Sequence, residues 1–337
     1  MVSNDKSWLD RRTLLAGAGA LCAAPALARG RRLAIIEAPS NLGLRPLRLG
    51  HEPGAWAAPK ALRDAELHKK LAPAAVMSLP RPQYRFEPEP GTRIRNGHEI
   101  RRFSEALANM VSRTLRSGSF PLVLGGDCSI LLGCLLGARA SGQIGLVHVD
   151  GHSDFFHPGN YDADVRPGSA AGMDLALATG RGETLLASWD GEPLVEDAHV
   201  VQIGERDETD PDYAYRDIEQ TLIRRLPVRE VLRLGISASV ARALAPVGSE
   251  RRKLWLHVDL DVLNASLMPA VDSPGSPGLG FRELAMLIDA FARSGRVLGM
   301  DVTIFDPELD PDGQYAGAIA QCLVDGLSAL RIDEEPR

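Results

Sequence analysis

The 337-residue sequence has no excess of basic residues, few cysteines and no hydrophobic run long enough to suggest a membrane-spanning helix. Its 38 lysines and arginines stand against 44 aspartates and glutamates, so the formal net charge is −6. Nucleic-acid binding needs a positively charged surface, and we therefore expect no nucleic-acid partner. Hydrophobic residues make up 45% and charged residues 24% of the chain, a composition that excludes a disordered or collagen-like protein.

An uncharged, Ala/Gly/Leu-rich run near the N-terminus extends from Thr13 to Ala28 and directly follows Arg11 and Arg12. The run is short for a membrane span of about 20 residues, and it ends in a small-x-small pattern typical of signal-peptide cleavage. It resembles a twin-arginine export signal. We predict a signal peptide over residues 1–28 and a folded domain over 29–337. The expected location is periplasmic or secreted, with transient membrane contact during export, or cytoplasmic if the signal is not used.

Short apolar runs alternate with helical patterns along the rest of the chain. Nearly continuous hydrophobic runs are typical of strands buried on both faces of a parallel sheet, and they lie at 32–36, 120–124, 144–149, 200–203, 254–260 and 297–302. Helical spacing of apolar residues predicts helices at 96–117, 129–138, 281–293 and 314–330. This alternation predicts a single three-layer α/β/α domain with a mostly parallel sheet.

Two of the predicted strands lead into aspartates and histidines at alternate positions. One reads Asp150-Gly-His152-Ser-Asp154, and the other ends in Asp259-Leu-Asp261. Alternate side chains of an extended segment point the same way, and the carboxyl ends of parallel strands form the edge where ligands bind. Four carboxylates and an imidazole at such an edge are enough to bridge two metal ions roughly 3.5 Å apart. The sequence therefore predicts a binuclear site for divalent cations.

Two further histidines lie on these strands. His148 shares a face with Asp150, and His257 shares a face with Asp259. Both could support the predicted ligands from below as hydrogen-bond donors, or they could simply pack in the core. The sequence leaves both interpretations open.

The order and spacing of these segments resemble the ureohydrolase family of arginases, agmatinases and formimidoylglutamases. The likeness is carried by Gly125-Gly126-Asp127-Cys128-Ser129 and the two acidic segments, together with Met268–Gly275, and weaker similarity covers most of residues 29–337. The resemblance implies an arginase-like fold and two divalent ions, Mn(2+) in the first place. A bridging hydroxide would attack a guanidino or amidine carbon and release urea, or a related small amide, and an amine.

The resemblance also assigns roles to individual residues. It implies that Asp150, His152, Asp154, Asp259 and Asp261 are metal ligands, and that Asp154 is catalytic because it holds the hydroxide. The expected partner is a small guanidino or amidine substrate, and the family suggests a homo-oligomer, either a trimer or a hexamer.

Cys128 is the first departure from the family pattern, because most members have a histidine ligand at that position. As a thiolate it remains a candidate metal ligand and would shift the preference of the site towards Zn, Fe, Co or Ni. The alternative is a site with one metal weakened or lost. The other two cysteines beyond residue 28, Cys134 and Cys322, are expected to be buried thiols.

Two further departures concern the substrate. The glutamate that contacts the guanidinium in the family is replaced by Ile304, which favours a less basic group such as an N-hydroxyguanidine or a formimino group. Asp306 and Glu308 lie close in sequence and could take its place. The histidine that transfers a proton in arginases is replaced by Ala171, and His157 is the nearest candidate general acid.

The leading hypothesis is thus an exported, metal-dependent hydrolase of guanidino or amidine C–N bonds. Two alternatives remain: an amide hydrolase on the same fold, and a degenerate relative that binds metal without turnover. Reaction products and metal-loaded assays distinguish them.

Overall fold

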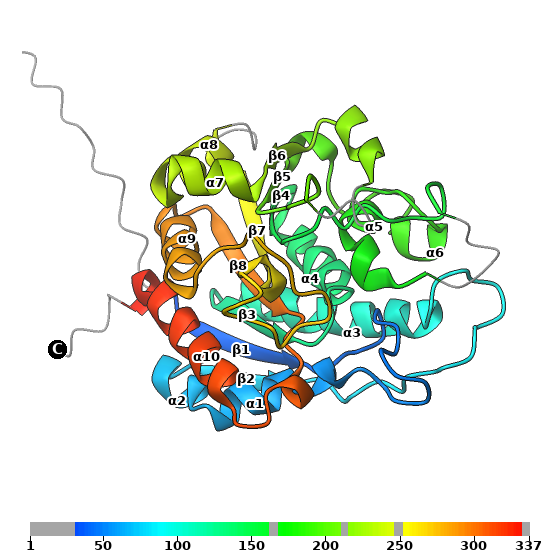
Figure 1. The fold of residues 1–337 in the computed structure, drawn as a ribbon, viewed down its shortest axis with the longest axis horizontal. Coiled ribbons are helices and arrows are strands. Elements are labelled where there is room, and N and C mark those ends of the chain that lie inside the picture. Colours follow the sequence, from blue (N-terminus) through cyan, green and yellow to red (C-terminus); the bar gives the residue numbers. More distant parts are fainter. Residues whose placement is uncertain (1–30, 162–167, 210–214, 246–251, 332–337) are drawn as a thin grey trace, which may run out of the picture.

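A single sheet of eight strands organises the protein (Figure 1). The computed structural model describes residues 31–161, 168–209, 215–245 and 252–331, so the predicted signal peptide lies outside the described residues. The strands lie in the spatial order β2 (Ala75–Ser78), β1 (Leu33–Ala38), β3 (Phe120–Gly125), β8 (Val297–Thr303), β7 (Lys253–Asp259), β4 (Ile144–Val149), β5 (Val200–Ile203) and β6 (Arg224–Leu226). All neighbouring pairs are parallel.

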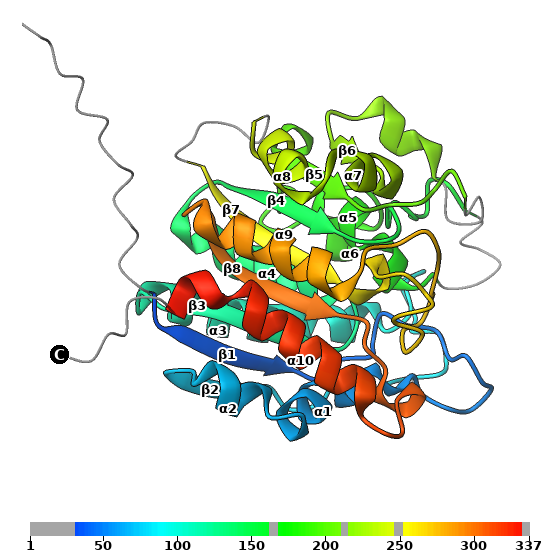
Figure 2. The same cartoon turned by 60° about the vertical axis from the view of Figure 1, so that its left-hand side comes forward.

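Helices cover both faces of the sheet and complete the three layers (Figure 2). One face carries α3 (Gly97–Arg116), α4 (Ile130–Ala138), α5 (Asp174–Ala178) and α6 (Thr184–Ala187). The other carries α1 (Ala58–Asp64), α2 (Leu67–Leu71), α7 (Val228–Leu234), α8 (Ile236–Leu244), α9 (Phe281–Arg293) and α10 (Gln314–Gly326). None of the helices in the described part of the chain is long and apolar enough to cross a membrane.

The two cores explain why the strands are apolar throughout. Successive strand residues point to opposite faces. Ile35 therefore packs in the core beneath α1, α2 and α7 to α10, while its neighbour Ile36 packs in the core beneath α3 to α6. The predicted single α/β/α domain is confirmed.

The buried strands and long helices lie where the sequence predicts them, apart from small shifts at their ends. The largest shift is in α10, which ends at Gly326 and is followed by a separate 3₁₀ helix at Ser328–Arg331. The sequence prediction missed α1, α2, α5, α6, α7 and α8 and both edge strands. The edge strand β2 has four residues and is mostly exposed, and β6 has three residues of which two are arginines, so neither resembles the longer buried runs of the central strands.

The topology brings the chemically interesting strand ends together. Strands β3, β8, β7 and β4 are neighbours at the centre of the sheet, and all four point the same way. Segments that are distant in sequence, from Cys128 after β3 to Ile304 after β8, therefore meet at one edge of the sheet.

Candidate metal centre

The residues predicted to bind metal gather at this edge. The Sγ atom of Cys128 lies 2.7 Å from Asp259 Oδ2, and His152 Nδ1 lies 2.8 Å from Asp261 Oδ2. The backbone N–H of His152 donates to Asp150 Oδ1 at 2.6 Å. All five side chains are buried, so a compact set of anionic groups and one imidazole sits where β3, β4 and β7 end.

Local backbone features position these side chains. A Cβ atom at Gly151 would lie only 2.0 Å from Nη1 of Arg206, and one at Gly275 would lie 2.1 Å from its Nε. The guanidinium of Arg206 therefore passes between two glycines, and its Nη1 donates to the backbone carbonyl of Asp261 at 2.9 Å. Asp154 has a left-handed backbone with φ of 45°, which aspartate adopts more readily than most residues.

Burial and mutual repulsion dominate the electrostatics. Loss of water is the main reason that the pKa values of Asp150, Asp154 and Asp259 lie well above their usual range, and the neighbouring aspartates raise them further. Burial acts on Asp261 too, but the charges of His152 and Arg206 outweigh it and lower its pKa to about 2.

The pKa of the Cys128 thiol is raised for the same reasons as those of Asp150, Asp154 and Asp259. Burial is the main cause and the negative charge of Asp259 the next, and together they raise it well above the ordinary value. A nearby dication would reverse this preference, because it stabilises the thiolate and the ionised carboxylates.

The donor set fits divalent cations. Asp150 Oδ2 is buried and has no hydrogen-bond partner among the described residues. Ligand atoms of Asp150, His152 and Asp261 lie within 4.8 Å of one another. A buried carboxylate oxygen without a partner is unfavourable unless a cation satisfies it, and carboxylate, imidazole and thiolate are the usual ligands of Mn, Zn, Fe and Co. The residues present can therefore hold the ions that the sequence predicts.

A second group of ionisable side chains lies beneath these ligands, and we call His148, Asp174, His257 and Asp301 the lower cluster. His148 on β4 and His257 on β7 are direct neighbours in the sheet, and their rings stack with centroids 4.8 Å apart. His148 Nε2 lies 3.1 Å from Asp174 Oδ1, and His257 Nδ1 lies 2.6 Å from Asp301 Oδ2. All four side chains are fully buried.

Sequence reasoning missed Asp174 in this group. It is the first residue of the five-residue helix α5, and nothing in the neighbouring sequence marks it as buried. The fold brings it to the strand ends because the N–H of Ala176 donates to the carbonyl of Asp154 at 3.3 Å. A single sequence carries no signal for such a tertiary placement.

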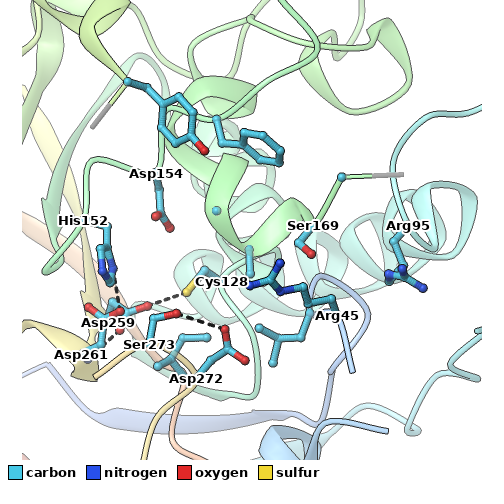
Figure 3. A pocket seen from close by; sticks show the side chains of 17 residues that line it. Arg45, Arg95, Cys128, His152, Asp154, Ser169, Asp259, Asp261, Asp272 and Ser273 are labelled. Atoms are coloured by element: carbon cyan, nitrogen blue, oxygen red, sulfur yellow. Dashed lines mark hydrogen bonds and ion pairs between the residues drawn. The ribbon is translucent and has the colours of Figure 1, made fainter. Parts of the chain in front are cut away.

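A cavity of about 380 Å³ opens above the predicted ligands. Its lining includes Cys128, His152, Asp154, Asp259 and Asp261. Figure 3 shows His152, Asp154, Asp259 and Asp261 gathered on one side. The cavity is large enough for a small organic molecule that places a reactive group against these residues.

The opposite side of the cavity is basic. Arg95 lies there in Figure 3, whereas the side chain of Arg45 extends from that direction towards Cys128, and both line the cavity together with Ser169. Asp272, a carboxyl that the sequence prediction also missed, lines the cavity too and accepts a hydrogen bond from Ser273 Oγ at 3.3 Å. Burial raises the pKa of Asp272.

Three residues suggested for substrate or proton chemistry do not line this cavity. His157 Nε2 is held 2.6 Å from the Asp217 carboxylate, so the structure does not bring it to the predicted ligands. Asp306 accepts from the backbone N–H of Gly54, and Glu308 pairs with His51. Both carboxylates are thus engaged outside the cavity lining, which does not favour the suggestion that Asp306 or Glu308 replaces the missing glutamate.

Two replaced positions, in contrast, do lie at the site. Ile304 and Ala171 both line the cavity. Ile304 has φ of 75°, an unusual value for a β-branched residue, and its N–H donates to the Gly126 carbonyl at 2.6 Å. An apolar side chain is thus held at the position where the family resemblance leads one to expect a carboxylate.

Known proteins share the sequence and the fold. The model of the Arginase family matches residues 31–327. The arginase of Bacillus caldovelox is 29% identical over 305 residues, which are 88% of this chain and 97% of that protein. Arginase-1 of Homo sapiens is 31% identical over 290 residues, 84% of this chain and 87% of its own. The solved structure of the Bacillus caldovelox arginase superposes with a TM-score of 0.74 at 26% identity, covering 91% of this chain and 99% of that one.

Proposed function

Because this chain belongs to the arginase family, we propose that it is a binuclear metal-dependent hydrolase of a small guanidino or amidine substrate. The family comprises hydrolases that act on the C–N bonds of linear amidines, and this chain is a hydrolase of that class. The observation that carries the finer proposal is the buried set of thiol, imidazole and carboxylates that lines one side of the cavity.

The proposed metal ligands are Cys128, Asp150, His152, Asp154, Asp259 and Asp261. Two divalent cations, Mn(2+) or a softer ion favoured by Cys128, would lower the pKa of a water molecule and stabilise the negative charge that develops on the substrate. The protein would hold the ligands in place through contacts between their own residues. Asp261 orients the His152 ring, and Arg206 donates a hydrogen bond to the backbone carbonyl of Asp261.

Asp154 is the proposed proton carrier. It lines the cavity. The bound cations would keep it ionised, and an ionised carboxylate is suited to take a proton from the attacking water and to deliver it to the leaving amine. His157 has no part in this scheme because it does not line the cavity.

The cavity walls suggest a substrate with two different ends. Ile304 leaves the reacting end without the carboxylate that would bind a guanidinium, so a weakly basic N-hydroxyguanidine or formimino group fits there. Arg45 and Arg95 in the cavity lining favour an anionic group such as a carboxylate.

Asp272 favours a second candidate, namely a cationic guanidinium. It is the one acidic lining residue outside the proposed ligand set among the described residues. Its carboxylate could supply the negative charge that Ile304 does not.

The test is an assay of purified protein loaded with Mn, Zn, Fe, Co or Ni against guanidino, hydroxyguanidino and formimino compounds with and without a carboxylate. We expect urea, a hydroxyurea or a small amide as product, and loss of activity in Asp154→Asn. Arg45→Gln should raise KM for carboxylate-bearing substrates, whereas Arg48→Gln, an exposed control outside the cavity lining, should not.

Two results would refute the proposal. Inactivity across the panel at full metal occupancy would indicate a binding protein, and release of a carboxylate with an amine would indicate an amide hydrolase. Asp272→Asn distinguishes the substrates: it should impair turnover only if the reacting group is a cation.

A further inference from the structure

The lower cluster has an arrangement that hydrogen bonding alone does not explain. Its members come from three strands and one helix: His148 from β4, His257 from β7, Asp301 from β8 and Asp174 from α5. None is exposed, and none is among the predicted metal ligands. Four buried ionisable groups have lost their hydration, and opposite charges or hydrogen bonds must replace it.

The ring of His257 is held in one orientation. Its Nδ1 lies 2.6 Å from Asp301 Oδ2, and the other oxygen of that carboxylate accepts from Trp255 Nε1 at 2.5 Å. Trp255 fits there because the strand beside it has Gly299, where a Cβ would lie 2.7 Å from the indole. A carboxylate at Nδ1 fixes the N–H on that nitrogen, which leaves the Nε2 lone pair available.

The available nitrogen faces another carboxylate. His257 Nε2 lies 3.5 Å from Asp174 Oδ2, and neither atom makes a hydrogen bond within the described residues. A lone pair opposite a carboxylate oxygen is repulsive unless something positive lies between them or the ring carries a second proton. Cys128 Sγ supplies a third donor, since one atom each of Cys128, Asp174 and His257 lie within 4.8 Å of one another.

We propose that a divalent cation binds among Cys128 Sγ, an Asp174 carboxylate oxygen and His257 Nε2, with Asp301 acting as the residue that positions the imidazole. The distance between the imidazole nitrogen and the carboxylate oxygen suits this site. Tetrahedral bonds of about 2.1 Å place two light ligand atoms roughly 3.4 Å apart, close to the observed 3.5 Å between His257 Nε2 and Asp174 Oδ2. The carboxylate behind His257 reproduces the carboxylate–histidine–metal arrangement common in zinc sites.

The donor chemistry selects the ion. A thiolate, an imidazole and a carboxylate favour Zn(2+), Co(2+) or Fe(2+) over Mn(2+). The site shares Cys128 with the proposed binuclear centre. The ion bound to Cys128 would therefore lie closer to the lower cluster than an ion held only by the aspartates at the strand ends. It does not depend on turnover, because cation binding is measured without substrate.

The test uses the full chain, stripped with a chelator and reloaded with Co(2+) or Zn(2+). We expect a thiolate-to-cobalt charge-transfer band in the near ultraviolet. Asp174→Asn and His257→Gln should each weaken binding of one ion by about 10–100-fold and reduce that band. Asp310→Asn removes a buried carboxylate that caps α10, Cys322→Ser removes a distant thiol, and both controls should bind like the wild type.

A second measurement on the wild type covers the case in which the variants do not fold. X-ray absorption of the zinc protein should show one sulfur and two imidazoles per protein, from His257 and His152. A single imidazole, or unchanged affinity and an unchanged cobalt band in both variants, would overturn the site and favour a cation-free imidazolium between Asp301 and Asp174. Wild-type protein that binds zinc as described but turns over nothing would refute the hydrolase and leave the site intact.

Discussion

Removal of metal should make the stability of the protein fall as pH rises. In the cation-free fold, the pKa values of Asp150, Asp154 and Asp259 lie well above the usual range because burial and mutual repulsion disfavour the charged forms. The same carboxyls in the unfolded chain have pKa values of about 4. Between about pH 4 and the raised values, the folded state therefore holds protons that the unfolded state has released, and unfolding becomes easier with increasing pH.

The size of the effect follows from proton linkage. Each proton by which the two states differ changes the free energy of unfolding by about 1.4 kcal/mol per pH unit. For a chain of this size, that corresponds to about 2 °C in Tm per pH unit and proton. Asp261 behaves in the opposite way, because its pKa of about 2 gives stability above pH 4 that is lost between about pH 4 and pH 2, outside the range of the assay.

The assay is thermal unfolding of chelator-treated protein from pH 5 to pH 8, with and without added divalent metal. We expect the Tm of the metal-free protein to fall across this range and the gain in Tm on adding metal to grow. Asp150→Asn, which mimics the protonated carboxyl, should raise the metal-free Tm at pH 8 and lose most of the gain from metal. A metal-free Tm that is constant or rises with pH would refute the electrostatic account of the cluster.

Three other predictions concern single positions. Ile304→Glu should raise kcat/KM for a guanidinium substrate about tenfold or more relative to a neutral one, since a new carboxylate in the cavity stabilises a cation; an unchanged ratio in steady-state assays would contradict the assigned position of the reacting group. Gly126→Ala should lower the free energy of unfolding by about 3 kcal/mol or more, because the new Cβ would lie 1.7 Å from the Ser40 carbonyl oxygen, whereas Gly317→Ala, with open space in α10, should be neutral or stabilising in the same denaturation experiment. Exported protein should begin after Ala28 on N-terminal sequencing, and replacing Arg11 and Arg12 by lysine should prevent export; a mature chain that begins at Met1 would contradict the signal.

The fold was largely predictable because its central strands are buried on both faces. A continuous apolar run, as in β3, β4 and β8, is read directly from the sequence. The edge strand β6 has only three residues, two of them arginines, so packing against β5 rather than its own composition makes it a strand. Local pattern does not contain that information.

The site likewise has a part that the sequence predicts, the ligands at the strand ends, and a part that it does not, the cavity wall. The predicted ligands lie in or directly after strands, and parallel pairing makes the strand ends converge, so sequence order and spacing were enough to bring them together. The cavity wall is different: Arg45 and Asp272 come from loops separated by most of the chain, and Asp174 from a five-residue helix. Their positions depend on how the loops cross above the sheet, which the apolar periodicity does not specify.

Cys128, Asp174 and His257 have a common physical explanation. Asp174 and Asp301 add two buried carboxylates beneath the four at the strand ends. Asp301 is held by His257 and Trp255, whereas Asp174 Oδ2 is buried without a hydrogen-bond partner among the described residues, which is unfavourable for a charged oxygen. A cation drawn towards Cys128 lies between the upper and lower sets and stabilises both. It also accounts for the ring of His257, which presents its free nitrogen to Asp174. Most of the family has a histidine ligand at the position of Cys128. In the proposed site His257 of β7 provides an imidazole in its place, so the loss of one histidine ligand is linked to the gain of another.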